Sequence, residues 1–170
     1  MKFKFVLLLL IAAGISVQAQ TKMAYINSST IMDQLPEAQD AQKQLDALTA
    51  DWQGELTKMG NEIRQKMDDY DSRKLIMSDK RRAEVEKELQ DLDKKLVDYR
   101  NQKFGTGGEM FSKQNELMKP IQEKIFKAVK DVADEEGYDY VVDRSSSTLL
   151  LYASSKNDLT QKVLAKLQQK

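Results

Sequence analysis

The chain of 170 residues contains no cysteine and no histidine. Without cysteine it cannot form disulfides, cysteine-ligated zinc or a cysteine nucleophile. Without histidine it lacks the commonest general base and transition-metal ligand. Only two prolines and seven glycines accompany 32% charged residues, a composition that predicts long regular segments rather than loops. The length suits one domain of ordinary size.

The first nineteen residues have the pattern of a secretory signal peptide. Two lysines precede an eleven-residue apolar run over 5–15, and small or branched residues at 17 and 19 follow it. This order is the charged region, hydrophobic region and cleavage site of an exported precursor. A membrane anchor is the alternative, but the run is too short to span a bilayer. We therefore expect removal of residues 1–19 and export to the periplasm, and no other segment is apolar enough to cross a membrane.

Short elements are expected at the start of the mature chain. Apolar side chains at Met23, Tyr25 and Ile26 predict a short strand over residues 22–27. Ser28 or Ser29 can cap a helical turn that runs to Leu35. Pro36 suits the first turn of the next helix, because the missing N–H is not needed there.

Spacing of apolar residues predicts a long helix over 38–77. Their steps alternate between three and four residues with a mean near 3.67, which favours a straight or slightly right-handed seam. The seam residues are Leu45, Leu48, Trp52, Leu56, Met59, Ile63, Met67 and Tyr70. Ser78 and Asp79 then interrupt the pattern and offer an N-cap with an acidic first turn.

A second helix is predicted to return along the first as far as about Glu136. It begins with a heptad seam formed by Val85, Leu89, Leu92, Leu96 and Tyr99. A second set, also seven apart, is Phe104, Phe111, Met118, Ile125 and Val132. The phase changes beside three glycines, and Pro120 adds another weak point. We expect one long helix, kinked in these two places, with a hinge formed by Gly105, Gly107, Gly108 and Pro120.

The C-terminal part is predicted to contain two strands and a helix. Gly137 is a plausible C-cap for the long helix. Strands are expected at 138–143 and 148–153, joined by the polar turn 144–147. Asn157 and Asp158 should cap a final helix that carries Leu159, Val163, Leu164 and Leu167.

These elements predict a mostly helical α+β fold. A long antiparallel helical hairpin, the arm (45–120), would project from a small β-rich body made of both chain ends (20–44 and 121–170). Helix 36–77 would be on the order of 60 Å long at about 1.5 Å per residue. Three short strands and one helix bury little apolar surface for a body that must be stable alone. We therefore expect an oligomer in which strands from several chains close one sheet.

Three segments resemble the Skp/OmpH family of periplasmic chaperones. They are 22–27 (KMAYIN), 128–133 (AVKDVA) and 138–143 (YDYVVD), and the resemblance extends over the mature chain. It implies a jellyfish-like homotrimer whose body gathers the chain ends and whose arms enclose a cavity. It also implies ATP-independent holding of unfolded outer-membrane β-barrel proteins, the clients.

The net charge of the mature chain differs from that of the enterobacterial members of the family, which are strongly basic. Without Lys2 and Lys4 the mature chain has 25 basic and 27 acidic residues, a net charge of −2. A basic patch is expected near the arm tip, formed by Arg73, Lys74, Lys80, Arg81 and Arg82. Because Asp68, Asp69 and Asp71 offset it, lipopolysaccharide binding is not carried over from the resemblance.

Two sets of residues are candidates for contacts. Apolar residues off the seam mark an interaction site when they are exposed, and the client-binding candidates are Leu75, Ile76, Met77, Phe104, Met110 and Phe111. Trp52 and Leu56 are assigned to the arm's packing instead. The body core or trimer interface is expected to include Tyr25, Ile26, Tyr138, Tyr140, Val141, Val142, Leu149, Leu150 and Leu151.

No enzyme, cofactor or metal site is expected. Carboxylate pairs such as Glu86 and Glu88 are two apart on a helix and point to different faces, which leaves a carboxylate hydrolase as a minor alternative. The glycines at 105–108 follow no strand and are not a phosphate-binding loop. Nucleic-acid binding lacks a net basic face. The main alternative to a holdase is a coiled-coil adaptor that docks one envelope protein through its tip.

Overall fold

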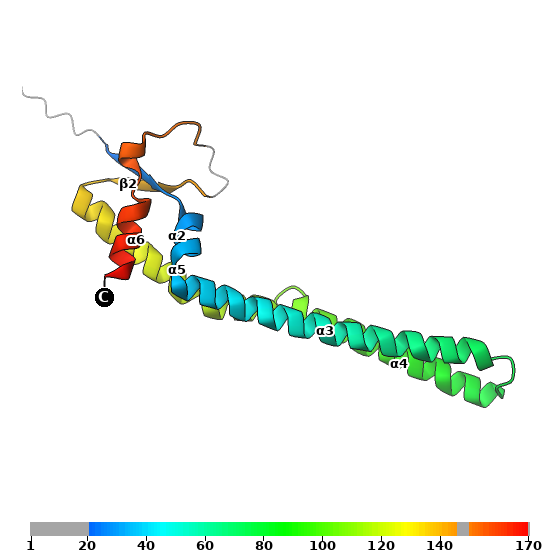
Figure 1. Cartoon of the computed structure of the whole chain (residues 1–170). Coiled ribbons are helices and arrows are strands. Elements are labelled where there is room, and N and C mark those ends of the chain that lie inside the picture. Colours follow the sequence, from blue (N-terminus) through cyan, green and yellow to red (C-terminus); the bar gives the residue numbers. More distant parts are fainter. Residues whose placement is uncertain (1–20, 146–149, 170) are drawn as a thin grey trace, which may run out of the picture.

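The computed structural model describes residues 21–145 and 150–169. It shows a small body at one end of a long arm (Figure 1). The predicted signal peptide at 1–19 and Leu149 lie outside the described residues. The elements in chain order are β1 (Met23–Ile26), α2 (Ser28–Gln34), α3 (Pro36–Arg73), α4 (Asp79–Phe104), α5 (Glu109–Glu136), β2 (Tyr140–Asp143), the 3₁₀ turn η2 (Ser155–Asn157) and α6 (Thr160–Gln168).

The sheet joins the two ends of the chain. β1 and β2 pair in parallel, with Met23 opposite Tyr140 and Ile26 opposite Asp143. On its other side β1 meets the segment before α6, where the Leu159 N–H donates to the Tyr25 carbonyl at 2.9 Å. Parallel pairing needs a long crossover, and here that crossover is the whole arm.

Helices α2, α5 and α6 cover one face of this sheet and form the core with it (Figure 1). Ile31, Leu159 and Val163 are fully buried. The core residues are Ala24, Ile26, Ile31, Leu35, Ala38, Ala41, Ile121, Ile125, Ala128, Val132, Leu159, Val163, Leu164 and Leu167. All of them fall within the two ranges assigned to the body.

Several predicted helix ends are confirmed. Pro36 is in the first turn of α3, and the Ser78 side chain caps α4 by accepting from the Arg81 N–H. Gly137 ends α5 in the left-handed conformation, with φ 70° and ψ 41°. The cap of α2 is Asn27, which accepts from the Thr30 N–H, so the serine caps predicted there are wrong.

The final helix begins slightly later than expected. Its N-cap residue is Leu159, and the neighbouring Asp158 carboxylate accepts from the Thr160 N–H at 2.9 Å. Asp158, one of the two predicted capping residues, therefore satisfies the first helical N–H from one residue before the observed N-cap.

The predicted continuous return helix is wrong. α4 ends at Phe104 and α5 begins at Glu109, so the four residues 105–108 form a break (hereafter the helix break). Gly107 has φ 73°, a left-handed conformation that a helix cannot contain. Pro120, by contrast, lies inside α5 and does not end it.

The predicted strand 148–153 does not form over its described part. Residues 150–153 have no ladder partner among the residues that the structure describes. The side chains of Leu151 and Tyr152 are 87% and 84% exposed. Among the described residues the outer edge of β2 stays unpaired, so residues 150–153 run past the sheet without extending it.

Helices α3 and α4 run side by side in opposite directions along the arm (Figure 1). Val85 and Leu89 are buried between them, whereas most other seam residues are only half-buried. Two helices share a single seam, so neither can bury its apolar stripe completely. The arm therefore depends on this one interface and on ion pairs along it.

Candidate functional site

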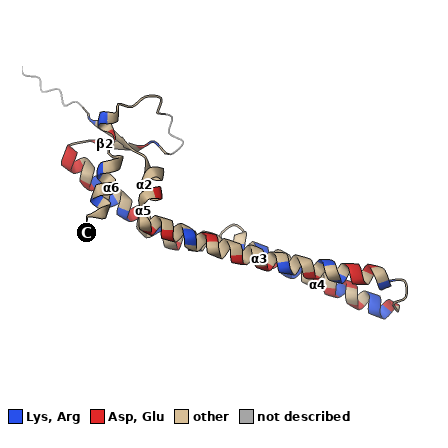
Figure 2. Cartoon of the chain, viewed as in Figure 1, with Lys and Arg blue, Asp and Glu red and all other residues tan. Residues whose placement is uncertain are grey.

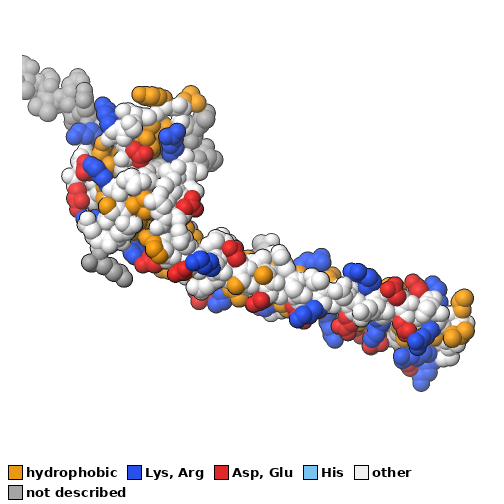
Figure 3. All heavy atoms as spheres, in the orientation of Figure 1, with side chains coloured by type: hydrophobic (Ala, Val, Ile, Leu, Met, Phe, Trp, Pro, Cys, Tyr) orange, Lys and Arg blue, Asp and Glu red, His pale blue; other side chains and the backbone are white. Residues whose placement is uncertain are grey.

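The tip of the arm exposes adjacent aliphatic side chains. α3 ends at Arg73, earlier than the predicted 77, and residues 74–77 form the turn into α4. Leu75 is 91% exposed and Ile76 is 86% exposed, while Met77 is half-buried. Hydrophobic side chains appear at this end of the arm in the space-filling view (Figure 3). Only two helices meet here, and no other described part of the chain covers Leu75 or Ile76.

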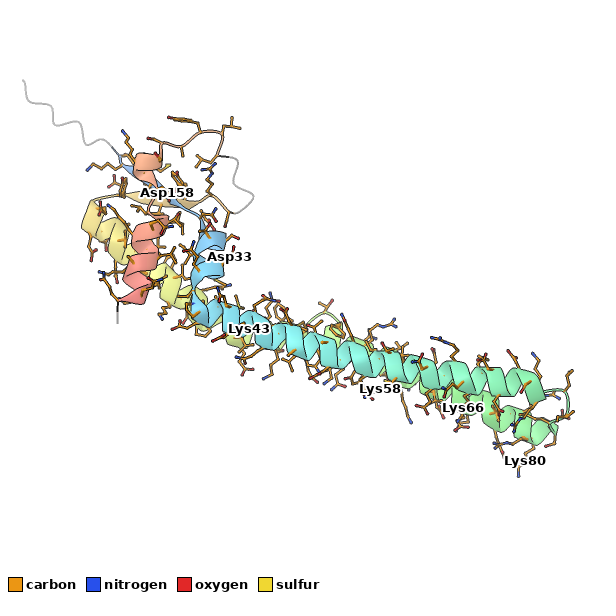
Figure 4. The ribbon with its side chains drawn as sticks, viewed as in Figure 1. Asp33, Lys43, Lys58, Lys66, Lys80 and Asp158 are labelled. Carbon is orange, nitrogen blue, oxygen red and sulfur yellow. The ribbon has the colours of Figure 1, made fainter. Side chains whose placement is uncertain are left out.

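Acidic neighbours partly neutralise the basic residues of the tip. Arg73 pairs with Asp69 at 3.0 Å, and Lys74 pairs with Asp71 at 2.9 Å. Arg81 and Arg82 pair with Glu84 and Asp79 at 3.2 and 3.7 Å. Among the described residues, only Lys80 of this patch has no ion pair, and it projects from the arm end in Figure 4. Figure 2 shows both signs of charge along the arm.

A second apolar group lies beside the helix break rather than at the tip. The Phe111 side chain is 59% exposed, and Met110 is half-buried. Phe104 packs edge-on against Trp52, with ring centroids 5.7 Å apart at 80°. Phe104 is therefore committed to the arm's own packing, and Phe111 is the exposed member of this group.

Close backbone contacts require two glycines of the break, and a positive φ requires the third. A Cβ built on Gly105 would lie 2.4 Å from the Asn101 carbonyl oxygen, and one on Gly108 would lie 2.8 Å from that of Gln102. Gly107 has open space around it but a positive φ of 73°. None of the three glycines combines a negative φ with room for a Cβ, so alanine at Gly105, Gly107 or Gly108 should destabilise the break.

Hydrogen bonds tie α4 to α3 near the outer end of the arm. The Lys66 ammonium donates to Glu88, and the Tyr70 hydroxyl donates to Glu86. The hydrogen bond from Lys66 lowers the pKa of Glu88, and the bond to Glu86 raises the pKa of Tyr70. The two carboxylates therefore accept from different residues of α3, an arrangement that holds helices together and offers no shared proton site.

The described residues among those predicted for the body core or trimer interface divide into three groups by burial. Tyr25 and Ile26 are buried within their own chain. Exposure is 59% for Tyr140 and 87% for Leu151. The half-buried members are Tyr138, Val141, Val142 and Leu150.

The contact residues predicted from the sequence do not include three exposed apolar residues of the body: Met23, Phe126 and Tyr152. The heptad spacing places Ile125 on the packed face of the helix and does not single out the adjacent Phe126, which is 74% exposed. Phe126 borders a groove of roughly 390 Å³ together with Met32, Val129, Val141 and Asp143. A signal was available in the sequence, because adjacent apolar residues on a helix cannot both face one core.

Features of other protein classes are missing from the described part. Over residues 21–145 and 150–169 no group of three or more acidic residues is arranged to hold a metal ion. No helix within these ranges combines the length and apolar character needed to cross a membrane.

Comparison with known proteins places the chain in a family. The model of the OmpH-like outer membrane proteins matches residues 22–167, so the chain belongs to the OmpH-like family. It is 32% identical to the chaperone protein Skp of Pectobacterium atrosepticum, over 92% of this chain and 91% of that relative. It is 31% identical to the chaperone protein Skp of Yersinia enterocolitica, with the same coverage.

A solved structure shares the fold. The crystal structure of an OmpH-like protein from Caulobacter crescentus CB15 superposes with a TM-score of 0.70. The match covers 88% of this chain and 85% of the other at 13% sequence identity. The body with its projecting arm is thus a fold found in this family despite low sequence identity.

Proposed function

We propose that this protein is an ATP-independent periplasmic holdase that binds unfolded outer-membrane β-barrel proteins and prevents their aggregation. The observation that carries the proposal is the exposed pair Leu75 and Ile76 at the end of the arm. Membership of the OmpH-like family and the similarity to proteins named chaperone protein Skp support it.

The geometry suits weak, repeated contacts with an unfolded chain. The arm presents one apolar group at its tip, where Figure 3 shows hydrophobic side chains, and a second at Phe111 beside the helix break. Charged side chains of both signs lie along the arm (Figure 2). Each contact is small, but several contacts to one flexible client raise the overall affinity through effective concentration. Such binding needs neither nucleotide nor covalent chemistry.

We further propose that the working form is a homotrimer joined through the body. The apolar side chains of Tyr140, Leu151 and Tyr152 are mostly exposed in the single chain. Within the described residues, β2 has a strand partner only on its β1 side. Natural proteins cover or pair such edges. Residues 150–153 of a neighbouring chain are suited to this role because they have no ladder partner in the described part of their own chain.

Aggregation of an unfolded barrel protein tests the holdase. Light scattering after dilution from urea should be suppressed by the mature protein without ATP, for several unrelated barrels. Leu75→Ser with Ile76→Ser should weaken suppression because it removes the exposed apolar pair. Gln53→Ser with Gln65→Ser, at exposed polar positions of the same arm, is the matched control.

Mass measurement with and without an unfolded barrel distinguishes the alternatives. A holdase forms complexes with several barrel proteins, and its free mass equals three mature chains. Unchanged scattering together with one stoichiometric complex to a single folded envelope protein would support the adaptor instead. A free mass of one chain would contradict the trimer but leave the holdase open to the scattering test.

A further inference from the structure

The side chain of Lys103 links the two sides of the helix break. Lys103 is in the last turn of α4, and its ammonium pairs with Glu109 in the first turn of α5 at 2.5 Å. Gln102 donates to the second carboxylate oxygen of Glu109 at 3.0 Å. Both hydrogen bonds cross the break, where the backbone ladder of the helix is interrupted.

Aromatic rings hold the same ammonium on its other sides. The Lys103 nitrogen lies 5.0 Å from the ring centre of Trp52 and 5.5 Å from that of Tyr99. Both distances are within the range of a cation–π contact. The Lys103 side chain is only 15% exposed, compared with 42% for Glu109. A lysine this poorly hydrated needs its anionic partner, so the pair is unlike the exposed ion pairs elsewhere on the arm.

Both helices of the arm are weakened at this level. Gly54 follows Trp52 by two residues in α3, and no atom lies within 4 Å of a Cβ built on it. Packing therefore does not require a glycine there, and glycine lowers helix stability. On the returning side the helix is broken between Phe104 and Glu109. Trp52, which contacts both Phe104 and Lys103, joins the two weak points.

We propose that the ion pair between Lys103 and Glu109 acts as a latch. It fixes the angle of a joint formed by Gly54 and the helix break, and the rings of Trp52 and Tyr99 flank the Lys103 ammonium. The outer arm is the part beyond this joint, residues 55–104. While the latch is closed, the outer arm is held in line with the part that enters the body. Opening it releases the outer arm to swing. The proposal concerns the chain's own mechanics and is independent of what the arm binds.

Three substitutions separate the latch from simple packing. Lys103→Gln removes the charge, Lys103→Met keeps an apolar chain of similar length, and Lys103→Arg keeps the cation. Lys113→Gln is the matched control, because Lys113 pairs at 2.7 Å with Glu116 on the same helix and does not cross the break. Circular dichroism and amide exchange in the body verify that each variant is folded.

The first readout is amide hydrogen exchange over residues 101–112 in the full mature protein. Loss of a coupled pair should speed exchange there roughly five-fold in Lys103→Gln and Lys103→Met. Lys103→Arg and Lys113→Gln should stay near the parent rate. A slow rate in Lys103→Met would show that packing alone holds the joint, which would overturn the latch.

The second readout is the distance from arm tip to body. Because the chain has no cysteine, spin labels can be placed at Lys80→Cys and Gln161→Cys, both exposed positions, with unlabelled protein in excess. The distance distribution should broaden in Lys103→Gln and Lys103→Met but not in Lys103→Arg. An unchanged distribution in all variants, or equal broadening in Lys113→Gln, would overturn the proposal.

Discussion

Alanine at Gly107 should destabilise the protein, whereas alanine at Gly54 should stabilise it. Both glycines have open space where a Cβ would be, so side-chain clashes do not differ between them. They differ in backbone conformation: Gly107 has φ 73°, and Gly54 is inside helix α3. The pair of substitutions therefore isolates the effect of the backbone.

The magnitudes follow from these conformations. An L-residue in the left-handed region costs about 1–2 kcal/mol. Restriction of the unfolded chain by alanine offsets about 0.4–1 kcal/mol of this, which leaves a net loss on the order of 1 kcal/mol at Gly107. At Gly54 alanine should add about 1 kcal/mol, because it is the better helix former. Gly105→Ala should cost more than Gly107→Ala, since its Cβ would lie 2.4 Å from a backbone oxygen.

Urea unfolding of the mature protein, followed by circular dichroism at one fixed protomer concentration, measures both effects. The midpoint should fall for Gly107→Ala and rise for Gly54→Ala, with the slope m unchanged. In thermal scans the shifts should be roughly 2–4 °C in opposite directions. A rise in midpoint for Gly107→Ala would refute the argument, because it would mean that the break adopts negative φ in solution.

Four further predictions follow from the structure. Lys66 and Lys103 hold the pKa values of Glu88 and Glu109 below the ordinary 4.5, so both ion pairs stabilise the arm above pH 4.5 and are lost as the pH falls through the lowered pKa values. Amide exchange along the arm should accelerate as the pH falls through those values, and less so in Glu88→Gln, which has no charge to lose. Ile31→Ala should cost about 2–5 kcal/mol in urea unfolding, since Ile31 is 0% exposed in the core, while Ile76→Ala at the exposed tip should change little. A chain without residues 45–120, joined by a short linker, should still trimerise in mass measurements, and a folded monomer would contradict assembly through the body. Client affinity should fall only modestly from low to physiological salt, because the mature net charge is −2, and a steep loss in a binding titration would mean that the basic tip patch dominates.

Local signals in the sequence were enough to predict most helices and several of their ends. The seam spacing predicted α3 and α4, because an amphipathic helix needs an apolar residue every three or four positions. Ser78 and Gly137 act at the ends of α4 and α5 through their own side-chain oxygen or backbone freedom. Such effects involve neighbours within one turn, so the sequence alone contains them.

The tertiary structure decided features that depend on distant residues or on exact dihedral angles. β1 pairs with a strand 117 residues away, between Met23 and Tyr140, and parallel direction follows only from how the arm returns. Three glycines near 105 were compatible with a kinked helix, but the positive φ of Gly107 makes a break, which the ion pair of Lys103 with Glu109 spans. The exposure of Leu75, Ile76 and Phe111 likewise depends on which surfaces meet. Local sequence patterns do not encode such long-range packing, because its free energy appears only when separate segments are brought together.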